Sequence, residues 1–261
     1  MSGQEAQEWL EFVDIMRELR GADGCPWDKE QTHESLKRFL LEESYEVLDA
    51  IDAADDAALC DELGDVLLQV VFHAQIAAEQ GRFTIEQVLQ GINRKMKRRH
   101  PHVFGAGSAE NSAAVLSQWE AIKAEENTAN GEARHIMKLN ENLPALLLAQ
   151  KVQDKAARVG FDWPDISGPW QKIEEELTEL RQAQSREQKL DELGDSFFAL
   201  VNLARFLDLD AEDSLRHTVK KFVLRFNYME RRLAENGRDW REYSLAGLDA
   251  LWDEAKKAEE R

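Results

Sequence analysis

Apolar residues recur every three or four positions along most of this 261-residue chain, which is the spacing of amphipathic helices. Gly81 is placed to end one predicted helix, Thr84 to begin the next, and the His100-Pro101 step to stop it. The pattern therefore predicts an all-α fold, with helices over residues 1–21, 36–53, 57–80, 85–99 and 146–160.

Two stretches of small and polar residues, 105–112 and 127–132, interrupt the helical pattern. Beyond the second stretch the order of elements repeats. Three pairs of similar segments lie 133, 130 and 133 residues apart: residues 41–46 and 174–179, residues 61–65 and 191–195, and residues 119–123 and 252–256. We therefore expect two tandem helical-bundle repeats, residues 1–127 and 128–261, and not a solenoid of many short units.

The composition narrows the class of protein further. Fourteen Gly and five Pro supply too few turns for a β-sandwich or barrel, and two Cys exclude a disulfide framework or a cysteine-built zinc site. The net charge of −18 argues against direct binding to nucleic acid or to an anionic membrane. The first twenty residues are amphipathic and acidic, unlike a signal peptide, so we expect a cytoplasmic protein without a membrane partner.

Each repeat carries the same acidic pattern on two successive helices. The first helix contains Glu-Glu-x-x-Glu and the second Glu-x-x-Asp, and residues three or four apart lie on one face of a helix. Because the two acidic segments are only 15 or 12 residues apart, the helices are expected to pack antiparallel and to bring the carboxylates together. The carboxylates are Glu43, Glu46, Glu62 and Asp65 in the first repeat, and Glu176, Glu179, Glu192 and Asp195 in the second.

A solvated helix face is the simplest interpretation of such acids, but apolar residues surround them, and Gly64 and Gly194 stand inside the second motif of each repeat. Clustered carboxylates repel one another unless a cation compensates. Ligands that are all carboxylate oxygens favour Mg²⁺, with Mn²⁺ as a substitute. A di-iron site would have His three residues after Glu, and Asp stands there in both repeats, which argues against such a site. A magnesium site of this kind indicates phosphate chemistry.

Basic and aromatic residues of the second repeat supply candidate phosphate and base contacts. Lys221 and Arg225 share a helix face, Lys172 precedes the acidic motif by one turn, and Lys256 follows Trp252 by four residues. These cations could equally be salt-bridge partners of the acids, and Trp252 could be a packed aromatic instead of a base-stacking residue. The histidines, including His33 and His73, show no spacing typical of ligands.

Several segments resemble the MazG nucleoside triphosphate pyrophosphohydrolase family in its two-repeat form. They are GCPWDKEQTHESL (24–36), LEESYEVLDAI (41–51), DELGDVLLQVVFHAQ (61–75), KMKRRHPHVF (95–104), VGFDW (159–163) and DELGDSFFALVNLAR (191–205). The resemblance covers nearly the whole chain. It implies an all-α fold that forms a homodimer, and Mg²⁺-dependent hydrolysis of NTPs or dNTPs to the monophosphate and pyrophosphate.

The resemblance also implies roles for residues of the second repeat. Glu176, Glu179, Glu192 and Asp195 match the family's magnesium ligands. Residues that match its nucleotide contacts are Lys172, Glu175, Lys189, Lys221, Arg225, Trp252 and Lys256, although Lys189 precedes Asp195 by six residues where the pattern has seven. In the mechanism that follows, Glu175 orients or deprotonates the attacking water, and Lys172 helps to offset charge on the leaving pyrophosphate.

The two repeats are not equivalent, because Phe39 stands in the first where Lys172 stands in the second. We therefore expect the second repeat to perform most of the hydrolysis and the first to be weaker or structural. Two other functions stay open at this stage: a regulatory interaction module with a structural ion, and a nucleotide hydrolase that releases orthophosphate.

Overall fold

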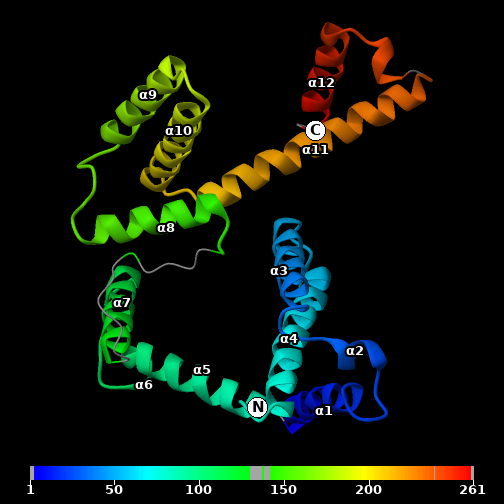
Figure 1. Cartoon of the computed structure of the whole chain (residues 1–261), viewed down its shortest axis with the longest axis vertical. Coiled ribbons are helices and arrows are strands. Elements are labelled where there is room, and N and C mark those ends of the chain that lie inside the picture. Colours follow the sequence, from blue (N-terminus) through cyan, green and yellow to red (C-terminus); the bar gives the residue numbers. More distant parts are fainter. Residues whose placement is uncertain (1–2, 130–136, 138–141, 238, 260–261) are drawn as a thin grey trace. The chain divides into compact units, whose positions relative to one another are not determined.

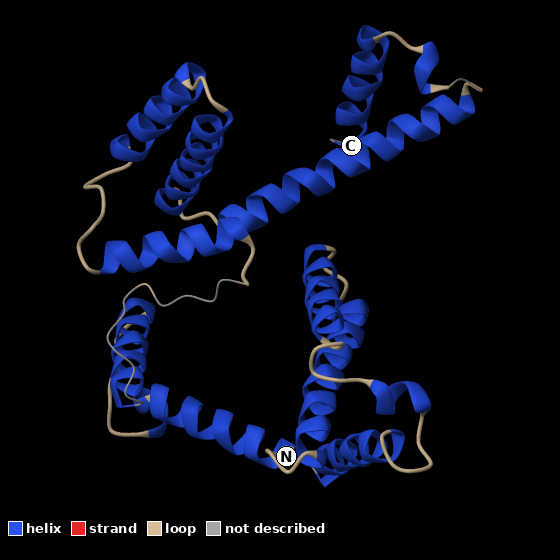
Figure 2. Ribbon diagram, in the orientation of Figure 1, coloured by secondary structure: helices blue, strands red, loops and turns tan. Residues whose placement is uncertain are grey.

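The computed structural model describes residues 3–129, 137, 142–237 and 239–259 of the chain. Helices and connecting loops make up this described part, and Figure 2 shows no strand within it. The predicted all-α fold class is therefore confirmed. The chain divides into two compact units, an N-terminal unit (Met1–Gly131) and a C-terminal unit (Glu132–Arg261), and each is described by itself below.

The N-terminal unit is built around an antiparallel helix hairpin, α3–α4. Helix α1 packs against α4, α5 leads away from the end of α4, and α7 packs back on α5 (Figure 1). Its helices are α1 (Gly3–Leu19), α2 (Pro26–Glu30), α3 (Lys37–Asp52), α4 (Asp56–Glu79), α5 (Ile85–Arg99), α6 (Pro101–Phe104) and α7 (Ser112–Ala129).

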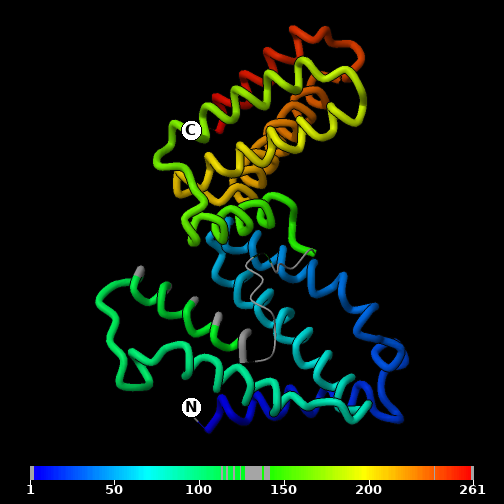
Figure 3. The backbone as a smooth tube through the Cα atoms, turned by 60° about the vertical axis from the view of Figure 1, so that its left-hand side comes forward, coloured from blue at the N-terminus to red at the C-terminus, as the bar shows by residue number. Residues whose placement is uncertain are grey.

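The C-terminal unit repeats this plan, and its α11 is longer than the corresponding α5. Helices α9 and α10 form the hairpin, α8 packs against α10 and the start of α11, and α12 packs back on α11, as the tube in Figure 3 traces. Its elements are α8 (Ala145–Arg158), α9 (Ser167–Gln182), α10 (Arg186–Phe206), α11 (Ala211–Glu235), the short 3₁₀ helix η1 (Trp240–Glu242) and α12 (Leu245–Glu259). Thus α1, α3, α4, α5 and α7 correspond to α8, α9, α10, α11 and α12.

The buried cores follow the apolar stripes that the sequence pattern predicts. One cluster joins α1, the start of α3 and α4 in the N-terminal unit: Val13, Met16, Leu36, Val71, Phe72 and Ile76. The C-terminal unit has a small cluster between α9 and α10 (Ile173, Ala199 and Leu203) and another between α11 and α12 (Met229, Leu233 and Leu251). The second hairpin therefore has a smaller buried core than the first.

The helix ends agree with the predicted capping residues. Thr84 forms a capping box with Gln87 at the start of α5, and Gly81 and Gly160 adopt φ angles of +65° and +85° just beyond α4 and α8. The short helices α2 and α6 were not predicted, and α7 continues through Ala129, past the predicted boundary after residue 127. Among the described helices, none is both long enough and apolar enough to cross a membrane.

Candidate active site

In the C-terminal unit the α9–α10 hairpin brings the predicted acidic residues together. Carboxylate oxygens of Glu176, Glu192 and Asp195 lie within 4.8 Å of one another, and oxygens of Glu175, Glu176 and Glu179 form a second group of the same size. Glu176 belongs to both groups because it stands one residue after Glu175 and three before Glu179 on α9. Two helices thus direct five carboxylates to one place.

Glu176 is the most buried member of this cluster, with 3% of its surface exposed. Its Oε1 oxygen lies 2.5 Å from Lys172 Nζ, which also donates a hydrogen bond of 2.7 Å to Glu175 Oε1. Its Oε2 oxygen is buried, and among the described residues it has no hydrogen-bond partner. A buried carboxylate oxygen without a partner is costly, so this atom fits a cation ligand that completes the site.

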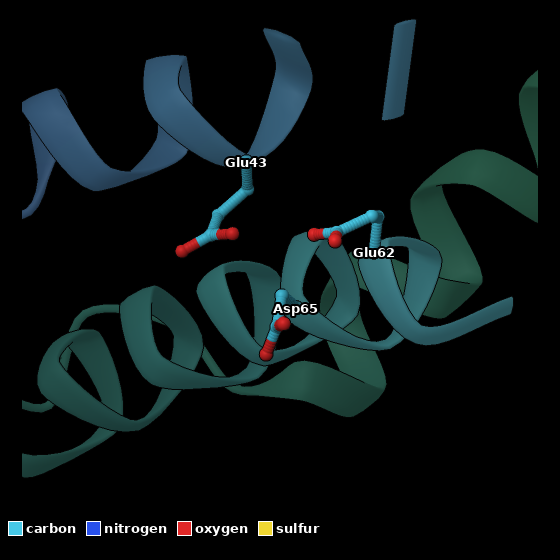
Figure 4. Close-up of side chains that lie close together, drawn as sticks. All are labelled: Glu43, Glu62 and Asp65. Carbon is cyan, nitrogen blue, oxygen red and sulfur yellow. The ribbon is translucent and has the colours of Figure 1, made fainter. Parts of the chain in front are cut away.

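The N-terminal unit forms the equivalent cluster on the α3–α4 hairpin. Figure 4 shows Glu43 reaching from α3 toward α4, where Glu62 and Asp65 stand one turn apart. Oxygens of these three side chains lie within 4.8 Å of one another. Three of the four predicted carboxylates of the first repeat therefore converge, and the charge of Glu46 raises the pKa of both Glu43 and Glu62.

In both clusters, neighbouring carboxylates raise one another's pKa. Burial, then Asp65 and Glu46, raise the pKa of Glu43 above its ordinary value. Burial, then Glu46 and Asp65, raise the pKa of Glu62, and burial, then Glu179 and Glu176, raise that of Glu192. A bound cation would reverse these shifts. The donor atoms are all carboxylate oxygens, which suit Mg²⁺ or Mn²⁺.

Lys172 is the cation that distinguishes the two clusters. Its hydrogen bonds to Glu175 and Glu176 raise the pKa of Lys172 above its usual range, so the ammonium stays charged at the edge of the C-terminal site. In the N-terminal unit the matching position is Phe39, which packs on the core and makes an edge contact with Trp27 at 5.9 Å between ring centroids. The N-terminal cluster therefore has an aromatic ring where the C-terminal cluster has a lysine.

The remaining predicted nucleotide contacts lie on other elements of the C-terminal unit. Arg225 on α11 pairs with Glu259 at 2.8 Å, and its guanidinium lies 5.6 Å from the ring centre of Trp252. Lys256 pairs with Asp253 at 2.6 Å. Lys221 is half-buried one turn before Arg225, and Lys189 is exposed on the first turn of α10.

The α11–α12 pair diverges from the α9–α10 hairpin within the C-terminal unit (Figure 1), and α12 packs against α11. One chain therefore brings Lys172, Glu175 and the four metal-ligand candidates together, but holds Lys221, Arg225, Trp252 and Lys256 on a separate hairpin. The same arrangement recurs in the N-terminal unit, where Arg99 pairs with Glu126 and lies 5.1 Å from the ring centre of Trp119.

Two features of the structure were not predicted from the sequence. The first is a histidine pair: His33 and His73 stack, and their Nδ1 atoms lie 2.7 Å apart. The two histidines are 40 residues apart in the sequence, so no short-range sequence pattern shows that they lie together. The second feature is a cavity beside Gln153 and Asn202, polar residues at positions facing the interior of the C-terminal unit; polar residues within an apolar stripe were the available signal.

Comparison with known proteins identifies the class of protein. Residues 31–104 match the model of the MazG nucleotide pyrophosphohydrolase domain. The chain is 48% identical to the nucleoside triphosphate pyrophosphohydrolase/pyrophosphatase MazG of Thermotoga maritima, over 96% of both chains. It is 45% identical to the nucleoside triphosphate pyrophosphohydrolase of Escherichia coli, over 95% of this chain and 97% of that one.

A more distant relative, the nucleoside triphosphate pyrophosphohydrolase of Mycobacterium tuberculosis, is 37% identical over 88% of this chain and 61% of its own. The chain belongs to the MazG family of nucleotide pyrophosphohydrolases. The family that the sequence motifs imply, and with it the enzyme class, is thereby confirmed.

Proposed function

We propose that the C-terminal unit hydrolyses nucleoside triphosphates and their deoxy forms to the monophosphate and pyrophosphate, with Mg²⁺ as its resident ion. The observation that supports this most directly is the unpartnered Oε2 oxygen of Glu176 inside a group of converging carboxylates. Glu176, Glu179, Glu192 and Asp195 would hold the ion. Mn²⁺, which accepts the same oxygen ligands, would substitute.

When bound, the ion supplies Lewis-acid polarisation of the phosphate oxygens and a template that orients them. Glu175, which is exposed beside the buried Glu176, accepts the proton of the water that attacks the α-phosphorus. The bond from that phosphorus to the bridging oxygen breaks, and pyrophosphate leaves. Lys172 stands within hydrogen-bonding distance of Glu175 and offsets the negative charge that grows on the leaving group.

A second copy of the chain would supply the separate cationic hairpin. The α9–α10 hairpin and α11 expose large apolar side chains, including Phe197 (53%), Leu190 (71%) and Phe222 (54%). Surfaces of this kind mark sites of association. We propose a homodimer in which Lys221, Arg225, Trp252 and Lys256 of one copy approach the carboxylates and Lys189 of the other.

Complementation between two damaged copies tests this arrangement. Glu179→Gln removes a metal ligand, and Arg225→Ala removes a cation on the other hairpin. If a site uses residues of both copies, a mixed dimer contains one intact site, so mixing the two weak variants after subunit exchange should restore part of the activity. A mixture no more active than the sum of its components would contradict a shared site, and mixed pairs of Glu179→Gln and Glu192→Gln serve as the non-complementing control.

The chemistry itself is tested by incubating the purified chain with ATP, GTP, CTP, UTP and the dNTPs in Mg²⁺, and separating the products. We expect monophosphate and pyrophosphate in equal amounts, no reaction in excess EDTA, and recovery with Mg²⁺ or Mn²⁺. Orthophosphate with a diphosphate product would identify the alternative hydrolase. An absence of product with every divalent ion would favour a regulatory interaction module.

We propose a cytoplasmic location for either function, which the free thiols of Cys25 and Cys60 support.

A further inference from the structure

Lys172 differs from other predicted phosphate contacts in the acids with which it pairs. Arg225 pairs with Glu259, and Lys256 pairs with Asp253, both on α12. Neither of these acids belongs to a carboxylate group found among the described residues. Lys172 instead pairs with two acids of the candidate site on its own helix, α9. The cation is therefore placed where it affects the binding of an ion.

The contacts of Lys172 converge on the carboxylate that both groups of the C-terminal unit share. Its Nζ atom lies 2.5 Å from Glu176 Oε1 and 2.7 Å from Glu175 Oε1. The other oxygen of Glu176, Oε2, is buried and has no partner among the described residues. The ammonium thus neutralises at one oxygen the same carboxylate whose second oxygen suits an ion.

The two partners of this ion pair differ in their freedom to move. The Lys172 side chain is 40% exposed, whereas that of Glu176 is 4% exposed. Lysine carries its ammonium on a long flexible stem, so Lys172 can turn from Glu176 toward solvent or a ligand while α9 stays in place. The buried carboxylate has no such choice and needs a positive partner where it stands.

An ammonium and a divalent ion on one carboxylate repel each other at close range. We propose that Lys172 is the counterion of Glu176 in the ion-free C-terminal site, and that it leaves Glu176 for the phosphates of the nucleotide when an ion takes its place. The transfer to phosphate rests on the proposed function. Lys172 then acts first as a positioning residue for the ligand Glu176 and afterwards as a contact to the substrate.

The N-terminal unit has the same carboxylate arrangement without this counterion. Phe39 precedes Glu43 by four residues, as Lys172 precedes Glu176. The ring of Phe39 packs on the core and against Trp27, and no described Lys or Arg forms an ion pair with Glu43. An ion that enters the N-terminal cluster displaces no ammonium, so a lysine at this position is what distinguishes ion binding in the two units.

Binding of Mn²⁺ without nucleotide tests the counterion role. The electron paramagnetic resonance signal of the free ion measures its Kd in full-length chains that carry Glu43→Gln and Glu62→Gln, which remove ligands of the N-terminal cluster. Lys172→Met should bind Mn²⁺ about fivefold more tightly, because one partly exposed ion pair no longer competes. Lys172→Arg, which keeps the charge, should stay within about twofold of the parent.

A change in net charge alone is excluded by a matched variant. Lys257→Met removes the same charge from an exposed position on α12 and should leave the Kd for Mn²⁺ within about twofold, because exposed charges are screened. An unchanged or weaker affinity in Lys172→Met would overturn the proposal. An equal gain in Lys257→Met would overturn it as well, because the field of the whole protein would then explain the effect.

The reciprocal graft keeps the test informative if Lys172→Met disturbs folding. In chains that carry Glu176→Gln and Glu192→Gln, Phe39→Lys places an ammonium four residues before Glu43 and should weaken Mn²⁺ binding by the N-terminal cluster about fivefold. Phe39→Met removes the same ring without adding charge and is the control, and circular dichroism checks the fold of both. Equal Kd values in these two variants would contradict the proposal.

Nucleotide binding supplies the second half of the test. In saturating Mg²⁺, Lys172→Met should bind α,β-imido-ATP, which has nitrogen in place of the oxygen to be cleaved, about tenfold more weakly by calorimetry. Tighter ion binding with weaker nucleotide binding is the expected signature, whereas a merely structural role for Lys172 would weaken both. A chain that hydrolyses NTPs but lacks this signature refutes the counterion role alone; an unmodified chain that hydrolyses no NTP refutes the proposed function.

Discussion

The two units share an order of helices and a group of converging carboxylates, but they differ at three matched positions. The N-terminal unit has Phe39, Phe72 and His73 where the C-terminal unit has Lys172, Asn202 and Leu203. Phe39 packs on the core and Phe72 is buried in it, whereas Lys172 contacts Glu176 and Asn202 lines a cavity. At two of these positions the N-terminal unit therefore has an aromatic side chain in or against its core, where the C-terminal unit has a polar side chain.

The difference also appears in the size of the cores. A buried Phe contributes roughly 1.5–3 kcal/mol of hydrophobic stabilisation, which polar Lys172 and Asn202 do not supply. The α9–α10 hairpin correspondingly has a small buried cluster of Ile173, Ala199 and Leu203. In the C-terminal unit the buried clusters are divided between the α9–α10 hairpin and the α11–α12 pair, whereas one cluster joins α1, α3 and α4 in the N-terminal unit.

The largest effect that follows from this comparison concerns the metal ligands. Glu179→Gln should lower kcat for ATP at least about 100-fold, because losing an ion that supplies several kcal/mol of charge stabilisation slows the reaction by that factor. Glu46→Gln, the same change in the N-terminal unit, should leave kcat within about twofold. Steady-state kinetics in saturating Mg²⁺ measure both, and circular dichroism checks that each variant folds.

If the two variants ranked in the opposite order of kcat, the catalytic role would belong to the N-terminal unit. The family model matches residues 31–104, which lie wholly in the N-terminal unit and include Glu43, Glu46, Glu62 and Asp65. If Glu46→Gln abolished turnover and Glu179→Gln spared it, the N-terminal cluster would be the catalytic one. Equal losses in both variants would mean that the two sites work together.

The pairing of acidic residues within each helix was predictable from the sequence, because the spacing of residues along a helix decides which face each side chain lies on. Residues three apart share a face, so Glu62 with Asp65, and Glu192 with Asp195, could be placed side by side without a structure. The internal repeat was predicted from three pairs of similar segments that lie 133, 130 and 133 residues apart in the sequence. The apolar period predicted α1, α3, α4, α5 and α8, whereas α2 and α6 are too short to show one.

Contacts between distant segments were not predictable in the same way. The Arg205–Asp162 pair joins residues 43 apart, and the divergence of α11–α12 from the α9–α10 hairpin depends on how the helices pack. Likewise, the sequence suggests that Lys172 and Trp252 contact one ligand, but not that they lie on separate hairpins. Tertiary packing determines which distant residues come together, and the spacing of apolar residues along one helix carries no information about that packing.

The smallest expected effect concerns a histidine pair that only the N-terminal unit contains. Arg82 donates to His33 Nε2, so the proton of this ring lies on Nδ1, which donates to His73 Nδ1 at 2.7 Å. In the C-terminal unit the matching residues are Ile166 and Leu203, which pack together in an apolar cluster and do not titrate.

Burial, and then His33, lower the pKa of His73 below its ordinary value of 6.5. The unfolded chain therefore binds this proton more readily than the folded one, so the N-terminal unit loses stability as the pH falls below about 6.5. His73→Leu, which copies Leu203, should remove this loss. Amide hydrogen-exchange protection of α4 at pH 7 and pH 5.5, corrected for intrinsic rates, measures it; we expect a severalfold drop in the unmodified chain and none in the variant. The exposed His217→Leu is the control that should retain the drop, and protection of α4 that is independent of pH before any substitution would show that the histidine pair does not distinguish the two units.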